Sequence, residues 1–179
     1  MADIDEKARS IGVSVHNNSS AKKWRCRSIT AQDEDESGGK HAIMLYLVRD
    51  GLPASNVKVQ FWWPKGEPGE PNHSDVYTGA AGEYEYIIWD GFDPAKEEGA
   101  YYLLVADGKP TDVPRGFGLP LNRHWVFNVV MEWVDGTQPA PVPAPVPPPD
   151  TGTSNYVTIE QAIVIAEGVA GYLKELVKK

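Results

Sequence analysis

The clearest pattern in the chain is an alternation of apolar and polar positions that recurs along its first three quarters. In residues 57–63 (VKVQFWW) every second side chain, counted from the first, is apolar, while Lys58, Gln60 and Trp62 fall on the opposite face. A period of two is typical of a strand with one buried face. The same alternation predicts six strands, over residues 24–30, 41–49, 57–63, 82–89, 101–106 and 123–134.

The predicted strands favour an antiparallel arrangement in two layers. Asp-Gly pairs fall at the ends of four runs, where a chain reversal needs residues that tolerate positive φ. No gap between the runs holds the amphipathic segment of about 10–12 residues that a helical crossover between parallel strands requires. In the last run, Val126 and Val130 make the second face partly apolar, which predicts a central strand covered on both sides. We therefore expect an all-β sandwich.

Two strings in this region carry a family resemblance. Residues 50–61 (DGLPASNVKVQF) place a G-x-P turn before an alternating strand, and residues 77–86 (YTGAAGEYEY) place a Thr/Gly-rich turn ending in Gly before the next strand. This pattern resembles bacterial immunoglobulin-like and carboxypeptidase-regulatory-like modules over residues 24–134. The resemblance implies an immunoglobulin-like sandwich, a fold used for spacers, adhesins, sugar binders and phage virion decorations. Residues 116–125 (GFGLPLNRHW) are similar to modules appended to bacterial and phage cell-wall proteins.

A proline-rich segment ends this region. Residues 139–149 (PAPVPAPVPPP) lack the backbone donors of a helix or sheet and predict an extended polyproline spacer. Before the first strand, Ile4, Ala8 and Ile11 at helical spacing, followed by Gly12, predict a short N-terminal helix. The expected organisation is an N-terminal extension at 1–23, a sandwich at 24–136, a linker at 137–156 and a C-terminal helix at 157–179.

The C-terminal segment has the pattern of an amphipathic helix. Thr158 and Gln161 fit a capping box, and the apolar positions follow a 3-4 spacing. Glu160 and Glu167 interrupt the apolar run too early for a membrane span. Because an isolated helix of this length is marginal, we expect a protein partner or a second copy to cover it, and folding back onto the sandwich is the alternative. The covered residues would be Ile159, Ala162, Ile163, Ala166, Val169, Ala170, Leu173 and Leu176.

Composition narrows the function classes. A formal charge of −8 and a pI near 5.0 argue against nucleic acid as a partner. Cys26 is the single cysteine and excludes an internal disulfide framework, and the N-terminus has no Sec-type signal pattern. No arrangement of nucleophile, base or carboxylate pair stands out from the composition, so we expect no enzyme and no cofactor.

One acidic stretch resembles the opening of a calcium loop. Asp33, Asp35 and Ser37 precede Gly38 in the D-x-D-x-S-G order that supplies ligands one, three and five. The twelfth position, where a bidentate carboxylate is expected, falls on Met44 within a predicted strand. A solvated acidic loop is therefore the favoured interpretation, and calcium binding is the alternative.

The aromatic residues give the best indication of a ligand. Alternation places some of Trp62, Trp89, Tyr102 and Trp125 on faces opposite the main core. Exposed aromatic rings on a sandwich stack against sugars or anchor a protein partner. The alternative is that the second sheet, the loop at 107–122 or a neighbouring subunit covers them.

Together these patterns predict a non-catalytic structural or adhesive module of a surface assembly, either a phage virion or a bacterial surface, attached or oligomerised through its C-terminal helix. The alternative is a carbohydrate-binding module that targets the cell wall or another polysaccharide.

Overall fold

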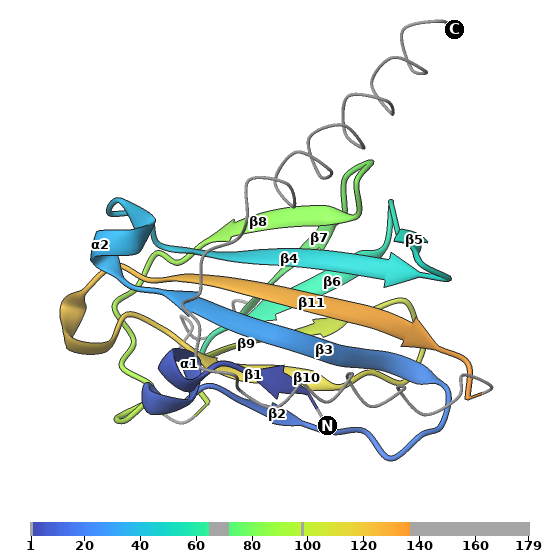
Figure 1. The fold of residues 1–179 in the computed structure, drawn as a ribbon, viewed down its shortest axis with the longest axis horizontal. Helices are drawn as coiled ribbons and strands as arrows, with labels where there is room; N and C mark the ends of the chain where they lie inside the picture. The colour runs from blue at the N-terminus through green and yellow to red at the C-terminus, as the bar shows by residue number, and fades with distance from the viewer. Residues whose placement is uncertain (1, 65–71, 98, 137–179) are drawn as a thin grey trace, which may run out of the picture. The chain divides into compact units, whose positions relative to one another are not determined.

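A computed structural model describes residues 2–64, 72–97 and 99–136, which form two β-sheets (Figure 1). The chain divides into two units, Met1–Gln138 and Pro139–Lys179, and every described residue belongs to the first. Its elements in chain order are β1 (Asp3–Ile4), α1 (Glu6–Ser10), β2 (Ser14–His16), β3 (Lys23–Gln32), α2 (Glu34–Ser37), β4 (Ala42–Arg49), β5 (Leu52–Pro53), β6 (Lys58–Trp62), β7 (His73–Tyr77), β8 (Glu83–Ile87), β9 (Tyr101–Val105), β10 (Val113–Phe117), the 3-10 turn η1 (Pro120–Asn122) and β11 (Val126–Val134).

The strands form two layers. Sheet A has the order β1-β3-β11-β4, with β5 and β8 both pairing with β4. Sheet B has the order β2-β10-β9-β6-β7 and lies behind sheet A in Figure 1. All six predicted strands are present, as β3, β4, β6, β8, β9 and β11. The prediction of an all-β, two-layer architecture is confirmed.

The expectation of a purely antiparallel sandwich is wrong for the centre of sheet A. There β11 runs parallel to β4, with Val126 opposite Ala42 and Trp133 opposite Arg49. Between these two strands along the chain lie β5 and β8 of sheet A, β6, β7, β9 and β10 of sheet B, and the 3-10 turn η1. Among the described residues of this connection, the crossover of the parallel pair is therefore built from strands of both layers and contains no α-helix.

The N-terminal segment supplies strands to both sheets. Parallel pairing joins β1 to β3, and antiparallel pairing joins β2 to β10. Between them lies the predicted short helix, now α1, whose Asp5 cap accepts a hydrogen bond from the Ala8 amide at 2.6 Å. Ala8 is fully buried. Residues predicted as an extension thus help to close the two-layer core.

Three strands lie in segments that the sequence pattern left as connections. They are the two-residue β5, then β7, and finally β10, which occupies the middle of the segment predicted as a loop at 107–122. Proline disfavours a strand interior, yet Pro114 is the second residue of β10 and is buried. Because Pro114 points inward, the flanking Val113 and Arg115 lie on the outer face of sheet B.

The core lies between the sheets and is rich in aromatic rings. Phe61 of β6 stacks on Tyr86 of β8 at 4.4 Å between ring centroids, which joins the two layers. At one end, Arg49 lies over the Trp24 ring at 5.0 Å, and the Trp24 indole donates to Asp107 at 3.1 Å. Burial of such rings is a major favourable term in a sandwich.

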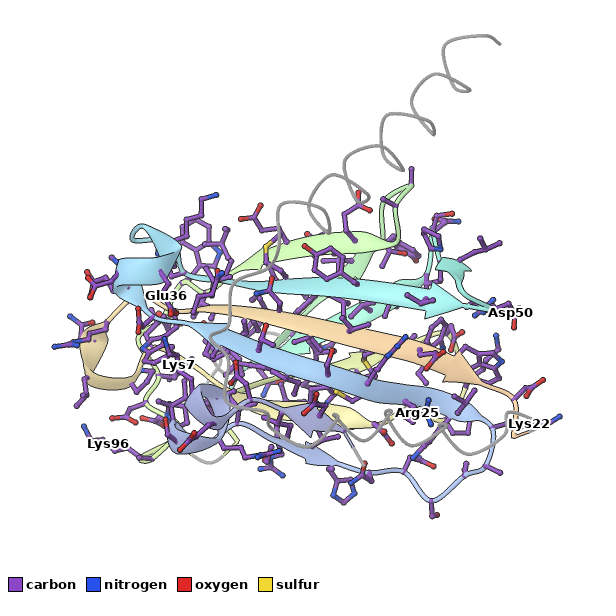
Figure 2. The ribbon with its side chains drawn as sticks, viewed as in Figure 1. Lys7, Lys22, Arg25, Glu36, Asp50 and Lys96 are labelled. Carbon is purple, nitrogen blue, oxygen red and sulfur yellow. The ribbon has the colours of Figure 1, made fainter. Side chains whose placement is uncertain are left out.

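Charged side chains surround this core at both ends, as Figure 2 shows for Lys7, Glu36 and Lys96 at one end and Lys22 and Asp50 at the other.

Candidate functional site

The outer face of sheet B carries one continuous row of aromatic and polar side chains. Strand register places His73 of β7 opposite Trp62 of β6, Trp62 opposite Tyr102 of β9, Tyr102 opposite Arg115 of β10, and Arg115 opposite Ser14 of β2. Buried neighbours on these strands face the core, so alternation turns this row outward. The row crosses the whole sheet, and we call it the outer row.

Three rings of the outer row lie nearly parallel. The His73 and Trp62 ring centroids are 4.2 Å apart at 22°, and the Trp62 and Tyr102 centroids are 5.8 Å apart at 6°. At 4.2 Å the imidazole covers part of one indole face. Both Trp62 and Tyr102 are half-buried. The row is therefore an aromatic strip that remains open mainly toward Tyr102 and β10.

A polar network fixes the orientation of the Trp62 indole. The Trp62 Nε1 donates to Gln60 Oε1 at 3.3 Å, and Gln60 Nε2 donates to Asp75 Oδ1 at 2.8 Å. The Lys58 ammonium lies 2.7 Å from the other Asp75 oxygen. The hydrogen bond from Lys58 is the main cause that lowers the pKa of Asp75, followed by that from Gln60. The carboxylate thus stays charged and holds the indole through Gln60.

On the other side of Tyr102, Arg115 lines two neighbouring hollows. One, of about 390 Å³, is lined by Tyr102, Val113, Arg115, Gly99 and His16. The other, of about 400 Å³, is also lined by Arg115, Gly99 and His16, and it extends over β2 to Gly12 and Pro94. Burial raises the pKa of Tyr102, and the nearby Arg115 charge opposes this shift. A sugar-sized ligand could contact the Tyr102 ring and the guanidinium together.

Two glycines place Arg115. The register of β10 against β9 shifts between Arg115 and Phe117, and Gly116 lies at this bulge with φ of 87°. A Cβ on Gly116 would overlap the carbonyl oxygen of Gly12. A Cβ on Gly99, which also has positive φ, would lie 2.9 Å from an Arg115 guanidinium nitrogen. The guanidinium therefore packs directly over the Gly99 backbone.

The structure brings together two of the four predicted aromatic residues. Trp62 and Tyr102 belong to the outer row, whereas Trp89 follows β8 and Trp125 precedes β11, both strands of sheet A. Trp89 is 79% exposed, and Trp125 is half-buried against the core, 6.4 Å from Phe127.

Sequence reasoning missed Arg115 and His73 because it assigned their strands to connections. The available signal for β10 was that Val113 and Arg115, on either side of Pro114, would share one face of an extended segment while Pro114 took the other.

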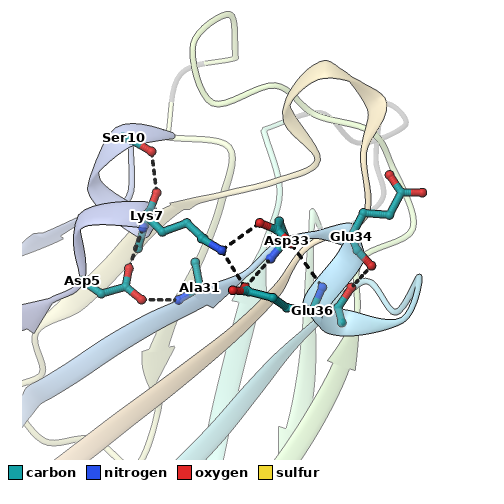
Figure 3. A network of polar contacts seen from close by, with 9 residues as sticks. Asp5, Lys7, Ser10, Ala31, Asp33, Glu34 and Glu36 are labelled. Carbon is teal, nitrogen blue, oxygen red and sulfur yellow. Dashed lines mark hydrogen bonds and ion pairs between the residues drawn. The ribbon is translucent and has the colours of Figure 1, made fainter. Parts of the chain in front are cut away.

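The candidate calcium residues lie in and beside a short helix. Asp33 caps α2 by accepting from the Glu36 amide at 3.2 Å, and its other oxygen accepts from Lys7 Nζ at 2.8 Å (Figure 3). These hydrogen bonds lower the pKa of Asp33, that from Lys7 most. Asp35 and Ser37 belong to the same helical turn. Across residues 2–64, 72–97 and 99–136, no three metal-ligating side chains gather at one place.

The predicted linker and the apolar stripe from Ile159 to Leu176 lie outside the described residues, so their helix and its partner stay predictions.

No protein-family model, curated protein or solved structure matches this chain. Within the part of the chain that the structure describes, no helix is long and apolar enough to cross a membrane.

Proposed function

We propose that the sandwich is a non-catalytic adhesive module that binds carbohydrate through the outer row of sheet B, and that it acts in a surface assembly of a phage virion or a bacterial cell. The outer row is the observation that carries this proposal. Aromatic rings stack against the apolar faces of sugars, and polar groups beside them fix the orientation of the ligand.

Three properties of the row favour a ligand over a purely structural role. Its rings lie on the outer face, and the Tyr102 ring borders a hollow of about 390 Å³. The indole of Trp62 is held by Gln60 and Asp75, so little side-chain freedom would be lost on binding. The row also lies on strands rather than loops, which gives the site a rigid base.

The two-layer architecture also supports the immunoglobulin-like assignment implied by residues 50–61 and 77–86. Gly82 supports it locally, because a Cβ there would overlap the backbone at Leu47 and Ala54. The turn that resembles those modules thus packs closely against β4 and the segment after β5. This supports a fold proposal, and function still rests on the outer row.

The test is retention of the full-length chain on glycans. Binding to insoluble peptidoglycan and cellulose is measured by pull-down, and binding to soluble polysaccharides by native affinity electrophoresis. We expect Trp62→Ala and Tyr102→Ala each to weaken binding about tenfold, which corresponds to about 1.4 kcal/mol. Trp89→Ala is the matched control, because Trp89 is an exposed tryptophan beyond the outer row. Thermal melting checks that each variant remains folded.

If no glycan is retained, or if Trp89→Ala weakens binding as much as Trp62→Ala, the outer row is not a sugar site.

The predicted C-terminal helix favours a second role, attachment or self-association. Its stripe from Ile159 to Leu176 needs burial, and the proline-rich segment before it predicts a spacer. Light scattering of the full chain and of a chain lacking residues 150–179 tests this role. We expect concentration-dependent oligomers that the deletion abolishes, and an unchanged mass would exclude self-association through this segment.

A further inference from the structure

Arg115 is a cationic side chain at the proposed sugar site. It lies in the outer row directly opposite Tyr102, and its guanidinium borders both hollows together with His16. Arginine presents a planar fork of donors that matches the two oxygens of a carboxylate or phosphate. A neutral sugar would use few of these donors.

Arg115 borders open space at both hollows. Among the ion pairs and side-chain hydrogen bonds found within residues 2–64, 72–97 and 99–136, none uses the Arg115 side chain. The acidic residue of the outer face, Asp75, lies on β7 and already pairs with Lys58 and Gln60. By contrast, Arg25 and Arg49 pair with Glu132 and Asp107.

The backbone around Arg115 is shaped to hold this position. The bulge at Gly116 interrupts the pairing of β10 with β9 immediately after Arg115. The guanidinium lies over Gly99, where any side chain would displace it. Bulges that re-aim a side chain are frequent beside binding sites. Both glycines have positive φ, which other residues adopt only with strain.

From these observations we infer that Arg115 recognises an anionic group, and that the saccharide bound at the outer row carries a carboxylate or a phosphate. This inference rests on the proposed sugar-binding function. The Tyr102 ring contacts the sugar face while Arg115 pairs with the charged substituent, and the exposed His16 lies beside the same hollow.

The test compares two saccharides that differ in charge and not in skeleton, and adds a third probe that carries its anion as phosphate on a different skeleton. Calorimetric titration of the full-length chain uses a galacturonic acid trimer, its methyl ester, and a poly(ribitol phosphate) that carries the anion as phosphate. We expect one of the two anionic probes to bind at least tenfold more tightly than the neutral ester. That preference should weaken as NaCl rises, because ions screen the contact between the guanidinium and the anion.

Two variants and a control make the test specific. Arg115→Gln should reduce binding of the anionic probe to the level of the neutral ester, and Arg115→Lys should retain part of the preference because it keeps the charge without the fork. Arg27→Gln removes an exposed arginine on sheet A and should change neither value. Equal binding of charged and neutral probes by the unmodified chain, or an Arg115→Gln variant that keeps the preference, would overturn the inference.

The inference and the proposed function can fail separately. If Trp62→Ala and Tyr102→Ala leave binding unchanged while Arg115→Gln removes it, the aromatic site is wrong and the anion site stands. If neither trimer nor polymer gives measurable heat, the ¹⁵N shift of the Arg115 Nε group is followed during titration with the galacturonic acid trimer. A saturable shift absent with the methyl ester supports the anion site, and no shift rejects it.

Discussion

The Asp112 carboxylate, fully buried immediately before β10, lies 2.8 Å from the Lys23 ammonium at the start of β3. The same carboxylate accepts hydrogen bonds from the backbone amides of Asn18 at 2.8 Å and Cys26 at 3.1 Å. One side chain thereby ties the segment between β2 and β3, strand β3 itself and strand β10 together. It joins the two sheets at the end of the strand that carries Arg115.

Replacing this carboxylate tests how much the buried pair contributes. We expect Asp112→Asn to lower the free energy of unfolding by about 3–5 kcal/mol, because the Lys23 ammonium, only 14% exposed, loses its counter-charge. Urea denaturation measures the change. Asp75→Asn, which removes the exposed pair with Lys58, should cost far less. Equal losses in the two variants would show that burial does not strengthen the Asp112 pair.

The Cys26 thiol should be inert in the folded protein. Burial, with a smaller effect of the Asp112 charge, raises the pKa of Cys26 from 9.0 to about 12. Thiol reagents react with the thiolate, so we expect no modification of the native chain at pH 8 and rapid modification in urea. Fast labelling of the native chain would contradict the burial of Cys26.

The same shifts predict a loss of stability in alkali. Burial also raises the pKa of Tyr86 from 10.0 to about 12. The unfolded chain then loses these protons at lower pH than the folded chain. The contribution of the two groups to the free energy of unfolding is therefore fully present below about pH 9 and is lost between about pH 9 and 12. Each group contributes a slope of about 1.4 kcal/mol per pH unit within its window.

Urea denaturation between pH 8.5 and 11 measures this slope, and Cys26→Ala should reduce it between pH 9 and 10. An identical slope in the variant would exclude Cys26 as its source.

Gly108 and Gly116 have similar φ angles but different surroundings, so alanine substitutions at the two positions distinguish the cost of backbone strain from the cost of steric overlap. Gly108 has φ of 82° and open space around it, whereas a Cβ on Gly116 would overlap the backbone of Gly12. We expect Gly108→Ala to cost about 1–2 kcal/mol from backbone strain alone. Gly116→Ala should cost about 1–3 kcal/mol more, because β10 must move from the turn after α1. Thermal melting compares the two variants, and equal melting temperatures would contradict the close approach.

The contact between α1 and α2 should depend on Asp33. Its carboxylate caps α2 and binds Lys7, so Asp33→Ala removes both interactions (Figure 3). We expect a small fall in melting temperature that Asp35→Ala does not reproduce. Because the pKa of Asp33 is lowered, this contribution is present above its usual value of 3.8 and is lost as pH falls through the lower folded pKa. No difference between the variants at pH 7 would contradict the capping role.

The sequence predicts the strands of this fold better than their pairing. Alternation located six strands, and Asp-Gly pairs marked turns where Gly51, Gly108 and Gly136 have positive φ. The parallel pairing of β4 with β11 has no local signal, because it joins residues far apart in the chain. Short β1 and β2 were missed as strands because two or three residues show no period.

The sequence predicts the orientation of two aromatic residues of the candidate site but not which residues lie beside each other. The outward position of Trp62 follows from alternation within β6, and that of Tyr102 follows in the same way within β9. Their adjacency depends on the register between β6 and β9, which the sequence does not encode locally. Arg115 was overlooked because three prolines near β10 resemble a loop. Its place beside Tyr102 becomes evident only once β10 is recognised as a strand.

The position of β11 between β3 and β4 has a consequence for how the chain folds. During synthesis, β3 and β4 are both completed long before the strand that separates them in sheet A, since they end at residues 32 and 49 and β11 begins at residue 126. Until β11 arrives, each of the two has an unpaired edge toward the gap, the kind of surface that promotes misfolding or aggregation. Closure must wait for a distant segment to insert, so we expect the slow folding that is typical of a high contact order.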